Sequence, residues 1–197
     1  MNHREYVGGM FDEMTKWQFD YVTTRPEFAK NKNFLDIGCG SMRLGKVLIP
    51  HMNKTRYYGL DINEELVKLG VEKECDPMHI INKEPTFIIT QNWDMSKTKN
   101  VHFAWAQAVF NHLNLDTIGE CLKNLHGVMT DTGVLYFTYW PGEYNPATDD
   151  TYTDKKQNIY KTKDQITELF AQHGFTVEHD VDVTNRGQTI CVARKHQ

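Results

Sequence analysis

Two glycines and a distant acid are the residues of this chain whose spacing best matches a chemical task. The apolar run 34–37 is followed by Gly38 and Gly40, and a second apolar run ends in Asp61 about twenty residues later. Glycines let the backbone turn sharply and approach a ligand closely, and a carboxylate after the next strand can accept both hydroxyls of a ribose. The spacing therefore predicts a nucleoside-cofactor site at the ends of two neighbouring strands.

The residues after these glycines disfavour a dinucleotide. Its fingerprint requires a third glycine three residues after the second, where this chain has Arg43, and Gly45 comes too late. An acid, Asp36, stands two residues before the first glycine instead. An NAD-linked oxidoreductase remains an alternative, and so does a non-catalytic subunit that only binds the cofactor.

The sequence DIGCGS at residues 36–41 resembles motif I of the class I S-adenosylmethionine-dependent methyltransferases. The resemblance runs from residue 36 to the final strand, and residues 36–45 and 107–113 are similar to a bacterial subgroup that acts on small molecules or glycans. It implies a Rossmann-like, doubly wound α/β sheet of seven strands, mostly parallel, with an antiparallel terminal hairpin. It also implies S-adenosyl-L-methionine as the cofactor.

The resemblance assigns roles to single residues. In the family, the motif I acid and the loop backbone hold the methionine moiety, the acid after the second strand binds the ribose, and residues after the third and fourth strands flank the adenine. Arg43 could donate to the cofactor carboxylate or pair with a surface acid, and Trp93 and Gln107 could serve packing or loop backbone instead. The candidate cofactor residues are Asp36, Gly38, Gly40, Arg43, Asp61, Ile62, Trp93 and Gln107.

His112 is the candidate catalytic residue. It follows the fourth predicted strand, and an imidazole that titrates near neutral pH can accept a proton from an attacking hydroxyl or amine. A capping or packing role and a contact with the methionine end of the cofactor are alternatives. Methyl transfer is an in-line displacement at an activated carbon, so positioning supplies much of the acceleration. Tyr6, Tyr139 and Trp140 are aromatic candidates for substrate binding.

The apolar pattern predicts the elements that position these residues. A leading amphipathic helix over 6–24 makes residues 1–25 a candidate helical lid. The connection 141–160 is long, and we expect it to form part of the wall of the substrate pocket. The alternative is a disordered polar loop on the surface. The pattern predicts strands at 33–37, 56–61, 86–90, 101–106 and 133–140, a turn at 131–133, helices at 44–52, 64–73, 115–129 and 163–173, and a hairpin of 175–183 with 188–194.

Composition limits the class of protein. A chain of 197 residues fits one domain, 1–197, and no apolar run is long enough for a membrane span. The four scattered cysteines indicate reduced thiols in the cytoplasm, and the histidines show no metal-ligand spacing. The net charge of −4 disfavours a nucleic-acid partner, and residues 107–110 lack the Asn/Asp-Pro-Pro-aromatic sequence of enzymes that methylate DNA base amines.

These observations lead to one functional prediction. We expect methyl transfer from S-adenosylmethionine to a small metabolite or a saccharide. Oxygen is the favoured acceptor atom and nitrogen is the alternative. The sequence leaves the oligomeric state open.

Overall fold

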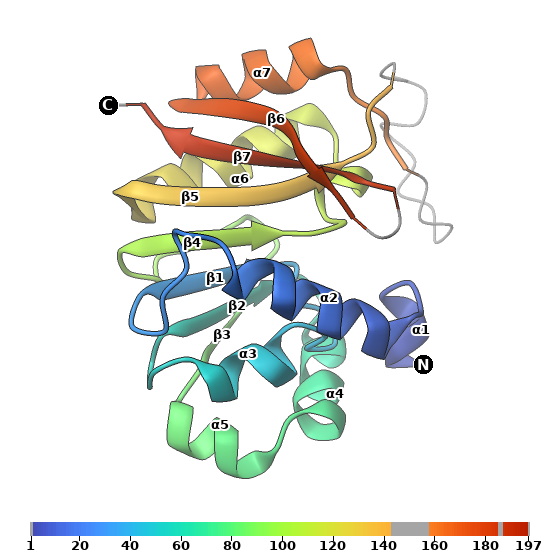
Figure 1. Cartoon of the computed structure of the whole chain (residues 1–197), viewed down its shortest axis with the longest axis vertical. Helices are drawn as coiled ribbons and strands as arrows, with labels where there is room; N and C mark the ends of the chain where they lie inside the picture. Colours follow the sequence, from blue (N-terminus) through green and yellow to red (C-terminus); the bar gives the residue numbers. More distant parts are fainter. Residues whose placement is uncertain (1, 143–157, 185–186, 197) are drawn as a thin grey trace.

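The computed structural model of the chain describes residues 2–142, 158–184 and 187–196, and its centre is a seven-stranded sheet in the order β3-β2-β1-β4-β5-β7-β6 (Figure 1). The first five strands pair in parallel, and β7 pairs antiparallel with β5 and β6. The predicted Rossmann-like sheet with its terminal hairpin is confirmed. The strands are β1 (Asn33–Ile37), β2 (Tyr57–Asp61), β3 (Thr86–Ile89), β4 (Val101–Ala106), β5 (Met129–Tyr139), β6 (Phe175–Val183) and β7 (Thr189–Lys195).

Helices cover both faces of this sheet. All five residues of β1 are buried, as expected for a strand packed on both sides. Aromatic and aliphatic side chains of α2 and α3 share a core with one face, and those of α6 and α7 share a core with the other (Figure 1). The helices are α1 (His3–Tyr6), α2 (Phe11–Thr23), α3 (Gly45–His51), α4 (Glu64–Glu74), α5 (Pro77–Lys83), α6 (Leu115–Val128) and α7 (Lys163–Gln172).

The leading helix is broken, so the prediction of one helix over 6–24 is wrong at its start. Gly8 and Gly9 separate α1 from α2 with φ angles of 98° and 68°, and Met10 follows at 46°. Left-handed backbone ends an α-helix, and glycine adopts it without steric cost. The short α1 can therefore turn away from α2 and lie beside α4 (Figure 1).

The predicted turn at 131–133 lies inside β5. Val101 pairs with Met129 and Phe103 pairs with Val134, so β5 carries extra residues between these two pairs and forms a bulge. A Cβ atom on Gly133 would lie 2.3 Å from Cγ of Met129. The turn-forming residues thus shape a bulge, and the strand begins four residues earlier than the predicted 133.

Sequence analysis missed α5, although its start carries a recognisable signal. Asp76 caps the helix by accepting a hydrogen bond from the Met78 N–H at 2.8 Å, and Pro77 occupies the first turn. Residues 143–157, which make up most of the predicted substrate-side loop, lie outside the described residues. Within the described part of the chain, no helix has the length and apolar character that crossing a membrane requires.

Candidate active site

The glycine loop after β1 has the backbone that the motif requires. Gly38 and Gly40 have φ angles of 71° and 51°. The N–H groups of Gly38 and Cys39 donate to the Leu60 carbonyl at 2.7 and 3.0 Å, which ties the loop to β2. A Cβ atom on Gly38 would lie 2.4 Å from Cγ2 of Val109, so both sterics and backbone restrict this position to glycine.

Asp61, the last residue of β2, contacts this loop directly. Oδ2 of Asp61 accepts a hydrogen bond from the Gly40 N–H at 2.8 Å, and Oδ1 accepts one from the Asn63 N–H at 2.8 Å. Burial raises the pKa of Asp61, and the backbone bonds from Asn63 and Gly40 offset only part of that shift. The adjoining Ile62 has a side chain that is 60% exposed. The structure therefore brings together Gly40, Asp61 and the adjoining Ile62, three of the predicted cofactor residues.

Asp36 lies beneath the loop and is only 4% exposed. The Tyr57 hydroxyl of β2 donates to its Oδ2 at 2.7 Å. Burial raises the pKa of Asp36 to about 7, against the lowering effect of the Tyr57 hydrogen bond. Its carboxyl group is thus hydrogen-bonded to β2, and its contact with a methionine moiety stays a prediction.

Arg43 binds the N-terminal segment, which we define as residues 2–10. Its guanidinium donates to the carbonyls of Val7 and Gly9, the latter at 3.3 Å. Cγ1 of Val7 would lie 3.1 Å from a Cβ atom placed on Gly40. Arg43 thus holds this segment against the glycine loop, an arrangement that neither of its two predicted roles anticipated.

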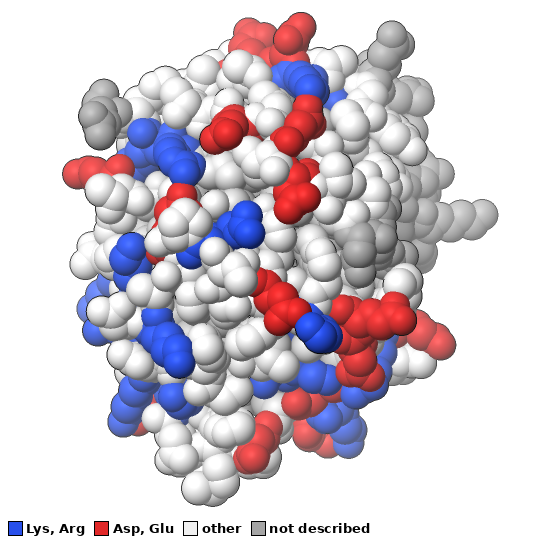
Figure 2. Space-filling view, in the orientation of Figure 1, with Lys and Arg blue, Asp and Glu red and all other residues white. Residues whose placement is uncertain are grey.

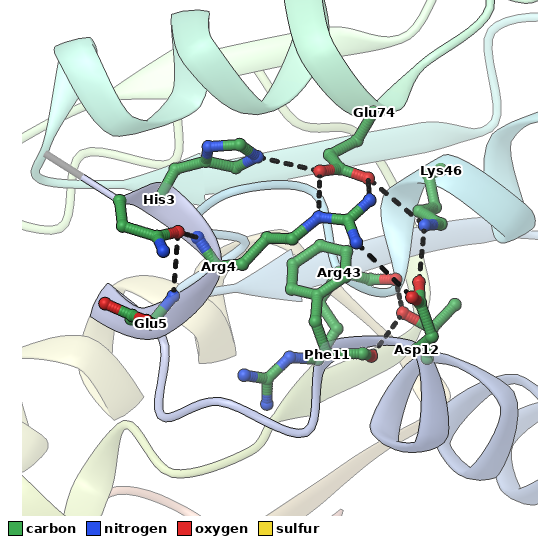
Figure 3. A network of polar contacts seen from close by, with 10 residues as sticks. His3, Arg4, Glu5, Phe11, Asp12, Arg43, Lys46 and Glu74 are labelled. Atoms are coloured by element: carbon green, nitrogen blue, oxygen red, sulfur yellow. Dashed lines mark hydrogen bonds and ion pairs between the residues drawn. The ribbon is translucent and has the colours of Figure 1, made fainter.

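A buried acid fastens the same segment to α4. Glu74 has a side chain that is 3% exposed and accepts hydrogen bonds from His3 Nε2 at 2.7 Å, Arg4 Nε at 2.6 Å and Lys46 Nζ at 3.1 Å (Figure 3). Burial raises the pKa of Glu74, but the bonds from Arg4, His3 and Lys46 outweigh it and lower the pKa to about 2. The guanidinium of Arg4 and the ammonium of Lys46 also lie 4.8 and 4.9 Å from the Phe11 ring centroid.

An amide pair joins α2 to the end of β4. The Gln18 amide nitrogen donates to the side-chain oxygen of Gln107, while Oε1 of Gln18 is buried and has no hydrogen-bond partner among the described residues. A buried acceptor without a partner costs about 1–3 kcal/mol. A ligand N–H or O–H group would remove that cost, so this place suits a polar group of the cofactor or substrate.

His112 lies in a 3-10 turn, η1 (Phe110–His112), directly after β4. Its backbone N–H donates to the carbonyl of Val109 at 3.1 Å, and the Val109 side chain lies against Gly38. The imidazole is half-buried. The candidate base is therefore three residues along the chain from Val109, which contacts the glycine loop.

The three predicted substrate aromatics lie in different environments. Tyr6 is 40% exposed at the end of α1, and Trp140 is half-buried after β5. Tyr139 is 0% exposed, with its hydroxyl 3.4 Å from Nδ1 of His179. Strand alternation points Tyr139 into the core that β5 shares with α7, and its role in substrate binding stays a prediction.

The predicted adenine corner borders a cavity. A space of about 460 Å³ lies past the end of β3. Trp93 has φ 59° and packs, half-buried, against the core on the α6 side of the sheet. This position agrees with the alternative prediction that Trp93 packs in the core. Stacking of Trp93 on adenine stays a prediction. The cavity is lined by Ile88, Ile89, Thr90, Gln91, Asn92, Asp94 and Lys97.

A sequence profile described as a methyltransferase domain matches residues 35–135, from β1 into β5. The chain belongs to this methyltransferase family. Membership confirms the resemblance to class I S-adenosylmethionine-dependent methyltransferases, together with the enzyme class and the cofactor that it implied. The matched residues include the glycine loop, Asp61 and His112.

Similar proteins span archaea and bacteria. An uncharacterized protein of Methanocaldococcus jannaschii is 26% identical over 150 residues, which cover 70% of this chain and 53% of that protein. A provisionally named O-methyltransferase from Nostoc punctiforme superimposes with a TM-score of 0.70 at 13% identity, over 98% of this chain and 61% of the other. Magnesium protoporphyrin IX methyltransferase from Synechocystis with bound S-adenosylhomocysteine gives 0.64 at 16% identity, over 98% and 85%. This chain thus spans about half the length of the curated relative, and the structural likeness shows the fold.

Proposed function

We propose that this domain transfers a methyl group from S-adenosylmethionine to an oxygen atom of a small metabolite or a saccharide. The observation that carries the proposal is the position of His112. Val109, whose side chain lies against Gly38, directly precedes the turn that carries His112, so the half-buried His112 is three residues along the chain from a contact with the loop that is expected to hold the methionine end of the donor. An imidazole at this edge can take the proton of an attacking hydroxyl.

The described residues fit the donor at three places. The left-handed backbone of Gly38 and Gly40 is that of the loop expected to hold the amino-acid end, the Asp61 carboxylate expected to bind the ribose is hydrogen-bonded to this loop, and Asn92 borders the cavity at the predicted adenine corner. Bound S-adenosylmethionine would supply a methyl carbon that its sulfonium already activates. The work of the protein is then to orient the acceptor, exclude water and receive a proton at His112.

The mixed charge on one face of the molecule and the proteins of similar fold favour a small acceptor over a nucleic acid. Acidic and basic side chains are interspersed on the face that carries α2 and α3 (Figure 2). Among proteins of similar fold, one acts in pyocyanin biosynthesis, one is a methyltransferase of calicheamicin biosynthesis and one methylates magnesium protoporphyrin IX. These small-molecule systems favour a metabolite over a macromolecule as the partner of this chain.

Two measurements test the proposal, first of cofactor binding and then of turnover. S-adenosylhomocysteine should raise the melting temperature of the protein and NADH should not. A panel of hydroxylated and aminated small molecules and sugars should then give a methylated product detectable by mass spectrometry. His112→Gln should lower turnover about 10²- to 10⁴-fold without changing donor affinity. His79→Gln on α5 is the matched control. Stabilisation by NADH, or full turnover by the His112 variant, would contradict the corresponding part of the proposal.

A further inference from the structure

A buried lysine lies against the turn that carries His112. Lys161 is 0% exposed, and its ammonium donates to the carbonyls of Phe110 at 2.9 Å and Ile159 at 2.8 Å. Burying an ammonium group is costly unless it is hydrogen-bonded, and bonds from a charged donor are stronger than those between neutral groups. Its burial could not be predicted locally, because a lysine in a polar stretch indicates a solvated side chain.

Backbone bonds place the Lys161 segment between η1 and the end of β5. The Ile159 N–H donates to the Asn111 carbonyl at 2.7 Å, so η1 receives a second bond from the same segment. On the other side, the Lys161 N–H donates to the Trp140 carbonyl at 3.3 Å and the Gly142 N–H donates to the Lys161 carbonyl at 3.0 Å. Residues 159–161 therefore bridge β5 and the turn.

The side chain of Asn111 connects the turn to β5 and to the residue before β7. It is 1% exposed, and in the orientation that satisfies its amide the nitrogen donates to the Thr138 carbonyl at 3.2 Å. Its oxygen then accepts from Gln188 Nε2 at 2.5 Å and from Trp140 Nε1 at 3.3 Å. Two of the three residues of η1 are thus fixed by buried polar contacts, and His112 is the third.

A 3-10 turn has poor internal hydrogen bonding and needs outside support to keep one geometry. We propose that Lys161 is a positioning residue, whose buried ammonium fixes the Phe110–His112 turn and with it the direction of the His112 imidazole. The inference rests on the proposed function, in which His112 receives the proton. Preorganised supporting contacts of this kind hold a reacting group within a fraction of an ångström of its working position.

Nuclear magnetic resonance of the full chain tests this assignment. In Lys161→Met we expect the His112 amide to exchange at least about tenfold faster, while the Leu35 amide of β1 keeps its rate. We also expect a changed tautomer ratio or titration midpoint of the His112 imidazole. Lys161→Arg should restore both signals, and Lys163→Met, which alters a lysine paired with Asp180 on the surface, should change neither.

Each outcome decides for or against the assignment. Unchanged His112 exchange and titration in folded Lys161→Met would overturn it. If that variant does not fold, Lys161→Gln, which keeps an N–H donor but no charge, takes its place. In wild-type protein, an ammonium signal from Lys161 that exchanges with water as fast as that of an exposed lysine would overturn it as well. Failure of S-adenosylhomocysteine to bind, or full turnover by His112→Gln, would instead contradict the proposed function.

Discussion

Asp61 and Gly40 are joined by a hydrogen bond of 2.8 Å from the backbone N–H of the glycine to the carboxylate. The acid expected to bind the ribose therefore also stabilises the loop expected to bind the methionine end. Its two oxygens are both used within the described residues, since the Asn63 N–H donates to the other. A change at Asp61 should accordingly affect both parts of the cofactor site.

Asp61→Ala should weaken S-adenosylhomocysteine binding by about 1–3 kcal/mol, which is roughly 5- to 150-fold in the dissociation constant. The loss arises because hydrogen-bonded groups lose their partner. Isothermal titration calorimetry measures it, and Glu64→Ala at the start of α4 is a nearby control on an exposed acid. A dissociation constant equal to that of the wild type would refute the ribose assignment.

Gly38→Ala should destabilise the protein by about 1–3 kcal/mol through steric and backbone strain. The added methyl group would lie 2.4 Å from Val109, and φ 71° is unfavourable for alanine. Val109→Ala should relieve the steric part, so a double-mutant cycle in urea unfolding should show a positive coupling. Additive losses would mean that the two side chains do not meet.

Glu74→Gln should lower the free energy of unfolding by about 1–3 kcal/mol, because hydrogen bonds to a buried charge are lost. The pKa of Glu74, about 2, lies below its ordinary value of 4.5. Ionised Glu74 therefore stabilises the fold above about pH 4.5, and this contribution is lost as the pH falls toward 2. Urea unfolding against pH measures the difference, with exposed Glu72→Gln as the control. A variant with wild-type stability at neutral pH would contradict the role of this cluster.

Asp36 should make the protein less stable as the pH rises. Its pKa is raised from 3.8 to about 7, so the folded state holds a proton that the unfolded state releases within this range. The contribution of Asp36 is most favourable below pH 4 and falls as the pH approaches 7. Asp36→Asn should flatten the stability profile in this window, whereas Asp164→Asn, at an exposed position on α7, should not. An unaltered slope would show that Asp36 is ionised in the folded state.

Local patterns predicted the sheet, and they also predicted that the glycine loop lies close to Asp61. β1 and β4 have the bounds that their apolar runs indicated, and Gly40 is hydrogen-bonded to Asp61. These features depend on residues close in sequence or on a fixed strand-to-strand geometry. They can therefore be recognised from the sequence alone.

Other features depend on contacts that no local pattern records. Glu74 binds Arg4 and His3, which are about seventy positions earlier in the sequence. No residue pattern around Glu74 predicts these two partners. The full burial of Tyr139 was not predicted, because strand alternation gives two faces and the sequence does not say which one meets α7. The break at Gly8 and the helix after Asp76 were signalled locally and could have been predicted.

The attachment of α1 beside the glycine loop has a practical consequence for handling the protein. A purification tag or fusion partner placed before residue 2 would emerge next to the edge where the cofactor is expected, within reach of Arg43 and Glu74. The carboxyl end leaves the sheet on the opposite side of the molecule (Figure 1). Immobilisation and labelling for binding assays should therefore use that end.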